Sequence, residues 1–492
     1  MPRRSGDEIR ATLVCAVAVV CATAWTIVYH LTFGDARLSV TLVFYGVTTS
    51  VLIAFLLAAV RRRSFTHLPP ADGTVIAIVP CFNTETEAVY RTVRSLLEQS
   101  RPPDEIYVID DGSDEPLQGF EHDRVWWFSH RNAGKRHAQA AILEHLKHRE
   151  FDFLLTVDDD AVLKPDAVEH TLRAMSDDRV QAATGLPVVR NRRDNWLTRT
   201  TDLEMVTWCL TVRSARSHVG AVAPCSGVLA VYRRDLVYDN LEDYVTSGTA
   251  GDDRRLTHYA LERGQAVAVN EAVVETTMPD TVKGLWRQRV RWFKSYWRYL
   301  FWEIKFLRPV PLLFRVYSLI FFVLTPVILA WVVLVLPGMD KLAAVQGFGY
   351  WITLTYAQTA MYAAQRPELA TRSRVVTWLL LTPVVSVVNL LVIKPAMYWA
   401  VTKARDESWQ TRSAGAGRDE ATRLVRAVPP PAGGPDRAAG YPAGPRTGPG
   451  GNVGHRARPT PHTAERPTQP RTEQTRLLPS NGVLPRGRQN GR

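Results

Sequence analysis

The feature that most constrains this chain is a pair of long apolar segments near its N-terminus. Residues 11–33 and 38–60 are each apolar over about 23 positions, long enough for a helix to cross the hydrocarbon core of a bilayer. A cleaved signal peptide is the alternative for the first segment, since Ala22-Thr23-Ala24 resembles a cleavage site. However, the run is longer than the apolar part of a signal peptide, and the second run follows within a few residues. The sequence therefore predicts two membrane helices within residues 1–63.

Arginines flank this pair on both sides. Arg3, Arg4 and Arg10 precede it, and residues 61–63 are three consecutive arginines. Basic residues concentrate on the cytoplasmic side of a membrane, so both flanks are predicted to be cytoplasmic. We therefore expect a multi-pass protein of the cell (plasma) membrane whose middle part is cytoplasmic.

Three further apolar runs occupy residues 312–337, 342–364 and 375–401. Five complete spans would export the Arg-rich C-terminus, against the same charge rule. The last run holds two prolines and one lysine, which favour a kink, a re-entrant path or an interfacial position: Pro383, Lys394 and Pro395. We predict a C-terminal membrane region over 312–402, commit to four spans in all, and leave the last run open.

Charge sets the C-terminal tail apart from the rest. Of the formal net charge of +12, nine positive charges fall in residues 403–492, which hold 16 Lys and Arg against 7 Asp and Glu. The remainder is nearly neutral, which argues against a nucleic-acid partner. Residues 404–492 are rich in Pro, Gly, Arg and Thr and are predicted to be disordered, with electrostatic tethering to anionic lipid or polymer as an alternative role. The five cysteines form no CxxC pair or Cys/His cluster, which excludes a disulfide framework and a structural zinc site.

Residues 72–280 alternate strand and helix patterns. Short β-branched or aromatic runs predict buried strands, and amphipathic stretches between them predict helices. The strands are expected at 74–79, 105–110, 125–128 and 153–157, and the helices at 88–99, at 138–148, at 255–263 and with Pro165 in the first turn of another. Residues 84–87 have the spacing of a capping box for the first helix. This order predicts an α/β domain with a parallel core sheet, in which ligands bind at the carboxyl ends of the strands.

Acidic clusters follow two of these strands. Asp110 and Asp111 end the second strand, and residues 158–160 are three aspartates that end the fourth. Asp158 and Asp160 are two positions apart, so their carboxylates can converge on one Mg²⁺ or Mn²⁺ ion that also binds substrate phosphate oxygens. Turn formation or helix capping is the alternative for each cluster. Two clusters at corresponding strand ends favour a binding site.

Three other segments carry chemistry with weaker signals. Residues 132–136 (NAGKR) precede a helix, so they can bring cations and free N–H groups to phosphates. Residues 251–254 (GDDR) open another helix, where Asp252 alone would serve as an N-cap. Residues 288–292 (QRVRW) lie in a Trp- and Arg-rich amphipathic stretch, 281–308, that suits a membrane interface. We expect that stretch both to lie at the membrane and to face an active site.

Taken together, these motifs resemble the signature of processive family-two glycosyltransferases, the cellulose, chitin and hyaluronan synthases. The sequence is most similar to that of hyaluronan synthases in four segments: NAGKRHAQ (132–139), CSGVLAVYRR (225–234), GDDRRLTHYAL (251–261) and RQRVRWFKSYWR (287–298). The resemblance covers roughly residues 10 to 410. Two departures concern channel gating and polymer length: the polar tail replaces the final membrane pair, and the gating-loop tryptophan motif is reduced to WQTRS at 409–413.

The resemblance implies a GT-A type, Rossmann-like fold that uses UDP-sugars, with roles for matching residues. Asp111 with Asp110 would hold the uridine, Lys135 would approach the diphosphate, and Asp158 and Asp160 would engage UDP and the divalent metal. Asp252 and Asp253 would be the catalytic carboxylates, with Asp253 as the general base. The acceptor collar would consist of Gln288, Arg291 and Trp292. Cys225 and Ser226 would line the same pocket, although a buried structural thiol is the alternative for Cys225.

Elementary chemistry agrees with this assignment. Breaking a sugar–UDP bond puts charge on phosphate, and an acceptor hydroxyl is a poor nucleophile that needs a nearby carboxylate. A single displacement would give a β-linkage from an α-linked donor. By the resemblance, the leading hypothesis is polymerisation of UDP-GlcA and UDP-GlcNAc into hyaluronan that threads outward through the bilayer. The alternatives are a single-donor chitin-like or other β-glycan synthase, and a non-catalytic membrane scaffold, which would be expected to have lost a motif acid.

Overall fold

The computed structural model describes residues 36–247, 251–334, 341–405 and 424–426, together with eight positions between 16 and 28. Most of the first predicted span (11–33), nearly all of the tail and the WQTRS segment lie outside the described residues. The described strands form one sheet. Their bounds are β1 Val75–Cys81, β2 Glu105–Asp110, β3 Val125–Ser129, β4 Phe153–Thr156, β5 Val162–Leu163, β6 Val180–Val189, β7 Ala230–Arg233, β8 Gln265–Thr276 and β9 Val425–Arg426.

The order of strands in the sheet is β5-β8-β6-β7-β4-β1-β2-β3-β9. β4, β1, β2 and β3 are parallel neighbours, which confirms the predicted parallel core. β7 runs antiparallel to both β4 and β6. Its first residue, Ala230, pairs with Thr156 at the carboxyl end of β4, because the chain reaches β7 through a loop at that edge and must run back. The sheet is therefore mixed rather than wholly parallel.

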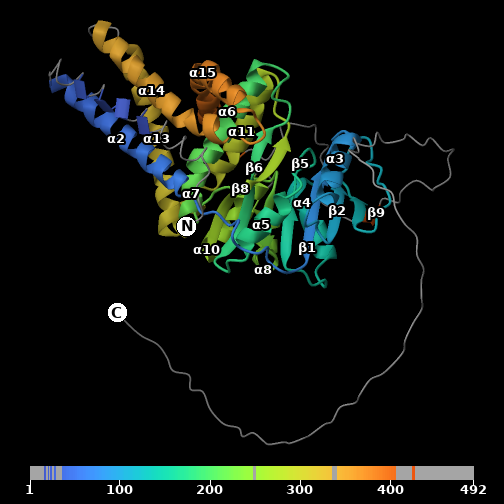
Figure 1. Cartoon of the computed structure of the whole chain (residues 1–492). Coiled ribbons are helices and arrows are strands. Elements are labelled where there is room, and N and C mark those ends of the chain that lie inside the picture. Colours follow the sequence, from blue (N-terminus) through green and yellow to red (C-terminus); the bar gives the residue numbers. More distant parts are fainter. Residues whose placement is uncertain are drawn as a thin grey trace, which may run out of the picture. The chain divides into compact units, whose positions relative to one another are not determined.

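Helices cover both faces of this sheet (Figure 1). One hydrophobic core lies between the sheet and the helices α3 (Thr86–Leu97) and α5 (Ala167–Met175). The second core contains residues of α4 (Lys135–His145), α8 (Arg234–Tyr238) and α10 (Asp252–Arg263). Both surfaces of the central strands are thus buried, as their uninterrupted apolar sequences require. The α/β prediction is confirmed.

Two local predictions about helix starts are wrong. No side chain caps α3, whose N-cap residue is Glu85, because the Thr84 hydroxyl bonds instead to Phe82 O and the Asp159 carboxylate. α5 begins at Ala167 rather than at Pro165. In the first case a tertiary contact takes the hydroxyl that a capping box would use.

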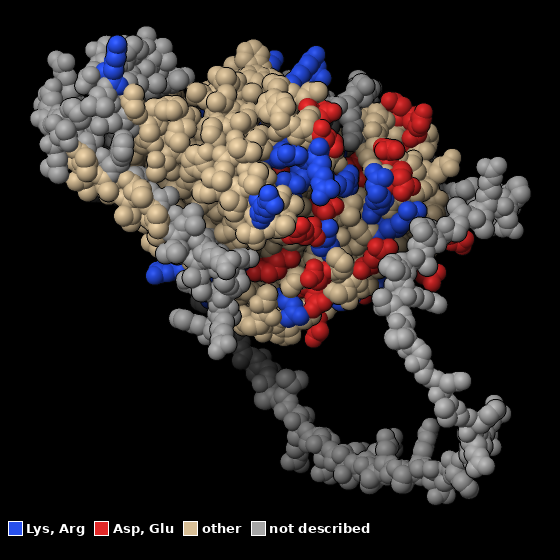
Figure 2. All heavy atoms as spheres, turned by 45° about the horizontal axis from the view of Figure 1, so that its top comes forward, with Lys and Arg blue, Asp and Glu red and all other residues tan. Residues whose placement is uncertain are grey.

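Of the remaining helices, α9 (Leu241–Thr246) contributes Tyr244 to the second core, and the others lie largely outside the α/β layers. These others are α2 Ala36–Val60, α6 Trp196–Trp208, α7 Ser214–His218, α11 Val282–Arg298, α12 Leu300–Phe306, α13 Pro309–Leu334, α14 Lys341–Gln365, α15 Thr371–Val388 and α16 Lys394–Thr402, with π-helical turns η1 Cys209–Arg213 and η3 Asn389–Ile393. α2 and α13 meet through Phe55, whose ring centroid lies 5.3 Å from that of Tyr317. α2, α13 and α14 extend together beyond the sheet (Figure 1), and the described surface there carries few charges (Figure 2).

These helices correspond to the predicted membrane segments. α2, α13 and α14 match the runs at 38–60, 312–337 and 342–364. Within the described part of the chain, Pro309–Pro326 and Thr371–Thr402 are long and apolar enough to cross a membrane. The apolar run at 375–401, whose path the sequence left open, forms α15, η3 and α16 in direct succession. The helix therefore continues past Pro383, and the π-helical turn accommodates the irregularity before Pro395.

A short part of the predicted disordered tail is ordered. Val425 and Arg426 form β9, which pairs with Ser129 and Phe128 of β3 in antiparallel register. Leu424 packs against the core that contains α4. The prediction of disorder over 404–492 is therefore wrong for this segment, because the open edge of β3 supplies backbone hydrogen bonds that composition alone does not reveal.

A buried ionic cluster joins the central sheet to the apolar helices. Asp202 of α6 is fully buried and accepts hydrogen bonds from Tyr362 Oη at 2.7 Å and from Arg366 Nη2 at 2.9 Å, both near the end of α14. It also accepts from Val189 N at the end of β6, and Arg192 Nε lies 3.4 Å away. One carboxylate therefore fixes α14 against the sheet.

Replacing Asp202→Ala should reduce the free energy of unfolding by about 3–5 kcal/mol, because Arg366 and Arg192 would remain buried without their counter-charge. Thermal unfolding in detergent measures this. Glu144→Ala, which removes the partner of exposed Lys147, is the control and should change stability by less than about 1 kcal/mol. Equal effects of the two substitutions would show that Asp202 is not the anchor.

Candidate active site

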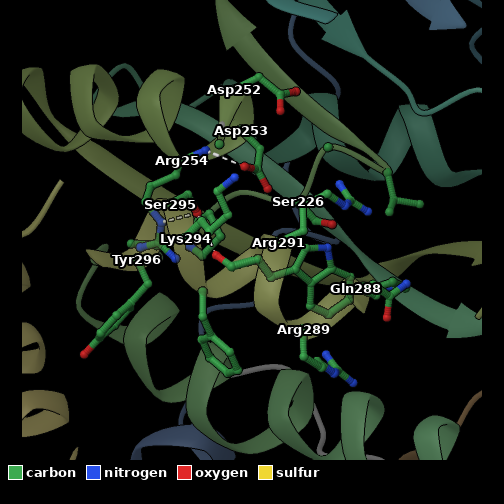
Figure 3. A pocket seen from close by; sticks show the side chains of 18 of the residues that line it. Ser226, Asp252, Asp253, Arg254, Gln288, Arg289, Arg291, Lys294, Ser295 and Tyr296 are labelled. Atoms are coloured by element: carbon green, nitrogen blue, oxygen red, sulfur yellow. Dashed lines mark hydrogen bonds between the residues drawn. The ribbon is translucent and has the colours of Figure 1, made fainter. Parts of the chain in front are cut away.

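A cavity of about 860 Å³ opens at the carboxyl ends of β1 and β4 and continues to α11 and α13. Its size is that of a site for a small organic ligand. Most of the residues predicted from the motifs line it: Asp111, Lys135, Asp158, Asp160, Ser226, Asp252, Asp253, Gln288, Arg291 and Trp292. Figure 3 shows Asp253 between Asp252 and the side chains of α11. The fold thus brings together segments separated by nearly 200 positions.

Asp111 lies just beyond β2 and organises the loop before α4. Its carboxylate accepts hydrogen bonds from Ala133 N at 3.0 Å and Gly134 N at 2.9 Å, and His130 Nε2 lies 3.1 Å away. Gly134 adopts a φ of 99°, which a glycine tolerates without strain. The two N–H groups are therefore occupied by Asp111, and the expectation that they are free for phosphates is not met.

Asp110 lies behind the cavity rather than in it. Its two carboxylate oxygens accept hydrogen bonds from Ser113 Oγ at 2.6 Å and Leu117 N at 3.1 Å. The side chain is buried and absent from the cavity wall. Asp110 thus shapes the loop that follows β2, which is the turn-forming alternative considered for this cluster.

Lys135, the first residue of α4, lies between two carboxylates. Its Nζ is 2.5 Å from Asp158 Oδ1 and 2.9 Å from Asp252 Oδ2. Although burial opposes it, these two charges raise the pKa of Lys135 well above its ordinary value, so the ammonium remains charged. Gly227 packs against this pair, and a Cβ there would lie 3.2 Å from both Lys135 Nζ and Asp158 Oδ1. The ion pairs therefore join β4, α4 and α10 at the cavity.

The aspartates at 158–160 form a crowded acidic wall. Burial and the charges of Asp159 and Asp158 raise the pKa of Asp160 to about 6. A divalent cation would relieve this repulsion. Among the described residues no three His, Cys, Asp or Glu side chains group to hold a metal by themselves. The residues fit an ion that takes one or two protein carboxylates and completes its shell with ligand oxygens.

Asp252 and Asp253 are the first two residues of α10, and their pKa values are shifted in opposite directions. Burial opposes ionisation of Asp252, but Lys135 keeps its pKa below the ordinary value. Burial and the neighbouring charge of Asp252 raise the pKa of Asp253 to about 6. The helix N-cap is Gly251, with a φ of 75°, so neither aspartate is the N-cap. One carboxylate is held ionised while the other can take up a proton near neutral pH.

α11 forms the opposite wall with its QxxRW residues. Gln288 Nε2 contacts Met278 Sδ at 3.5 Å, and its buried Oε1 has no hydrogen-bond partner among the described residues. Trp292 is 36% exposed, enough for a sugar ring to stack on it. Arg289 supports that ring, with its guanidinium 4.5 Å from the ring centroid and 2.6 Å from Glu204. The Arg289–Glu204 pair was not predicted.

The two residues of the 225–226 segment separate. Ser226 lines the cavity, whereas Cys225 is fully buried in the core beside α10, and its N–H donates to Thr257 Oγ1 at 2.8 Å. Burial raises the pKa of the Cys225 thiol to about 12. Cys225 therefore does not line the pocket, and the buried-thiol alternative describes it.

Sequence reasoning missed one end of the cavity, where Arg216, Arg254 and Arg315 line the wall. Arg315 carried a signal, since it is a lone charge in the apolar helix α13. Arg254 belongs to the GDDR segment, but no role was predicted for it, and Arg216 stands among many basic residues and carried no signal.

Comparisons with known proteins agree with this site. The family described as glycosyltransferase like family 2 matches residues 70–295. A hyaluronan synthase of Streptococcus pyogenes is 30% identical over 407 residues, covering 77% of this chain and 92% of that protein. An N-acetylglucosaminyltransferase of Rhizobium meliloti (strain 1021) is 29% identical over 393 residues, covering 73% of this chain and 90% of that protein.

Among solved structures, a mannosyltransferase from Pyrobaculum calidifontis in complex with GDP-mannose and Mn²⁺ covers 80% of this chain and 98% of its own, with a TM-score of 0.41 and 15% identity. The mixed sheet with helices on both faces is the GT-A fold expected of an enzyme that transfers a glycosyl group. By its sequence relatives, the chain belongs to the hyaluronan synthase-like glycosyltransferases of family 2.

Proposed function

We propose that this enzyme polymerises UDP-GlcA and UDP-GlcNAc into hyaluronan at the membrane and exports the polymer. One observation supports the proposal: a single cavity holds two groups of side chains. One group is the ion pair of Lys135 with Asp158, and the other is Asp253 with Trp292. Donor and acceptor halves of a transfer reaction would thus meet around Asp253. The domain limits we propose are those expected from the sequence, with β9 added to the catalytic domain.

The donor is proposed to bind at the β1–β2–β4 edge. Asp111, on the loop framework that Asp110 supports, would face the uridine, and Lys135 would face the diphosphate as its ion pairs exchange. Asp158 and Asp160 would hold the Mg²⁺ or Mn²⁺ ion. When bound, that ion supplies positive charge that stabilises the departing diphosphate.

The acceptor is proposed to bind against α11. Trp292 would stack on the terminal sugar, Gln288 and Ser226 would orient it by hydrogen bonds, and Arg291 would face the diphosphate. Asp253 takes the proton from the acceptor hydroxyl, and the oxygen of that hydroxyl forms a bond to the anomeric carbon of the donor sugar. The bond from that carbon to the UDP oxygen breaks, so configuration inverts and a β-linkage results.

The membrane arrangement supports export. α13 reaches the cavity through Arg315, Tyr317 and Phe321, and its Pro309–Pro326 segment is long and apolar enough to span a bilayer. We propose that the catalytic domain is cytoplasmic and that the growing chain leaves between these helices. A single-donor synthase making a chitin-like or other β-glycan is the second candidate, favoured by similarity to an N-acetylglucosaminyltransferase.

Asp253→Asn should lower the rate of UDP release from donor at least about 100-fold, because a general base contributes roughly 10²–10⁴ in rate. Binding of UDP should change little. Asp239→Asn, at an exposed aspartate paired with Arg263, is the control and should retain full activity. Near wild-type turnover in Asp253→Asn would rule out this base.

The rate should also fall on acidification. The pKa of Asp253 is raised to about 6, so the base is ionised above pH 6 and protonated below it. A pH profile of turnover at saturating donor should therefore show an acidic limb with an apparent pKa near 6. A rate independent of pH between about 5 and 7.5 would contradict the assignment.

Donor dependence tests the product. Purified protein in nanodiscs with Mg²⁺ or Mn²⁺ should release UDP continuously only when UDP-GlcA and UDP-GlcNAc are both present, and hyaluronidase should degrade the product. Continuous release with UDP-GlcNAc alone would establish the single-donor synthase instead.

A further inference from the structure

Three arginines converge on the end of the cavity nearest α13. Arg216 comes from α7, Arg254 from the first turn of α10 and Arg315 from α13, and all three line the same cavity as Asp253. In Figure 3 Arg254 and Tyr296 lie on the side of the site opposite Gln288 and Arg289. Among the ion pairs of the described residues, Arg254 and Arg315 pair with Glu303, whereas Asp158 and Asp252 at the donor end pair with Lys135.

Tyr296 holds two of these guanidinium groups in place. The Arg315 guanidinium carbon lies 3.5 Å from the centroid of the Tyr296 ring, and that of Arg254 lies 5.6 Å from it. Arg315 Nη2 also donates to Tyr296 O, at 2.5 Å, and Arg216 Nη2 donates to Ser318 Oγ at 3.4 Å. The cations are thus fixed before any ligand arrives, which lowers the entropic cost of binding.

The cluster has more positive than negative charge. Glu303 of α12 lies 2.6 Å from Arg315 Nε and 3.5 Å from Arg254 Nη1, and within the described part of the chain no other side-chain carboxylate pairs with these arginines. His258 adds no charge at neutral pH, because burial lowers its pKa to about 4. The charge of Arg254 also acts on neighbouring Asp253, so three guanidinium groups face two carboxylates and the cluster keeps an excess of positive charge.

Several donors of the cluster also lack partners. Arg315 Nη1, Arg216 Nε and Tyr296 Oη are buried and make no hydrogen bond within the described structure. Arg315 itself is 5% exposed. Unpaired buried donors and excess buried charge both disfavour the unliganded state, and an anionic oxygen ligand would correct both.

The place of the arginine cluster in the cavity indicates which ligand would meet it. The cluster follows Asp253 directly in the chain through Arg254, whose Nε donates to Ser295 Oγ at 3.3 Å, and it extends to Ser318 and Phe321 on α13. A saccharide that has accepted a sugar at Asp253 would therefore pass it on the way to the apolar helices. The diphosphate is proposed to bind near Lys135, which pairs with Asp158 and Asp252.

We propose that Arg216, Arg254 and Arg315 form a product-side subsite that binds the carboxylate of an acidic sugar in the growing chain. This inference rests on the proposed function, because it requires a polymer that contains a uronate. It makes the enzyme selective for an acidic over a neutral chain, independently of which donor is bound.

The test measures binding of three tetrasaccharides to full-length protein in phosphatidylcholine nanodiscs, which contain no anionic lipid. The ligands are an alternating GlcA–GlcNAc tetrasaccharide, the same tetrasaccharide with its carboxylates reduced to hydroxymethyl groups, and chitotetraose. Wild-type protein should prefer the acidic ligand to its reduced form by about tenfold, the scale of one charge-assisted hydrogen-bond pair. Equal affinities would overturn the subsite.

Arg216→Met should remove most of this preference while leaving the affinity for UDP unchanged. The double variant Arg315→Met/Glu303→Gln removes one cation together with its counter-charge, so it checks the same prediction without leaving Glu303 unpaired. Arg233→Met, which removes a half-buried arginine bonded to Val180 O and Met175 O away from the cavity, should keep the full preference. Retention of the preference in both cluster variants would overturn the proposal.

The outcome is separable from that of the proposed function. A protein that needs both donors but does not distinguish the acidic ligand from its reduced form would retain the proposed function and lose the subsite. A protein that turns over a single donor yet prefers the acidic tetrasaccharide would retain the subsite and lose hyaluronan as the product.

Discussion

The active-site architecture depends on the ammonium of Lys135, which is held between Asp158 and Asp252. A buried lysine remains charged only when carboxylates compensate for its lost hydration. Here those carboxylates come from the end of β4 and the start of α10, so neutralising one charge also fixes three elements relative to one another. Asp253 follows Asp252 immediately, and its position at the centre of the cavity is a consequence of this arrangement.

The same arrangement separates the ionisation of two adjacent carboxyl groups. Asp252 contacts Lys135 and stays ionised, whereas Asp253 experiences burial and the charge of Asp252, which raise its pKa. A group that takes a proton from a sugar hydroxyl must be ionised at neutral pH yet remain basic. The local fields therefore divide two identical side chains into a structural partner of the cation and a candidate base.

α11 has two environments because its two faces differ. Gln288 and Trp292 line the cavity, while Trp297 Nε1 donates to Met397 O of α16 at 3.0 Å. The sequence offered an interfacial helix and an active-site helix as separate interpretations of this Trp- and Arg-rich stretch. In the structure one face of α11 lines the cavity and the other packs against the apolar helix α16, so the same helix contacts both regions.

The sequence alone determined the elements and chemistry that depend on neighbouring residues. Buried β-branched runs identified β1, β2 and β4, and aspartates at their ends marked the edge where the cavity opens. Tertiary structure decided what depends on distant partners. Asp159 takes the Thr84 hydroxyl from the expected cap, and β3 orders Val425. Cys225 lies behind the cavity wall, and the arginine cluster draws on α7, α10 and α13. Local patterns encode backbone preference and amphipathicity, whereas pairing, register and charge balance arise only when remote segments come into contact.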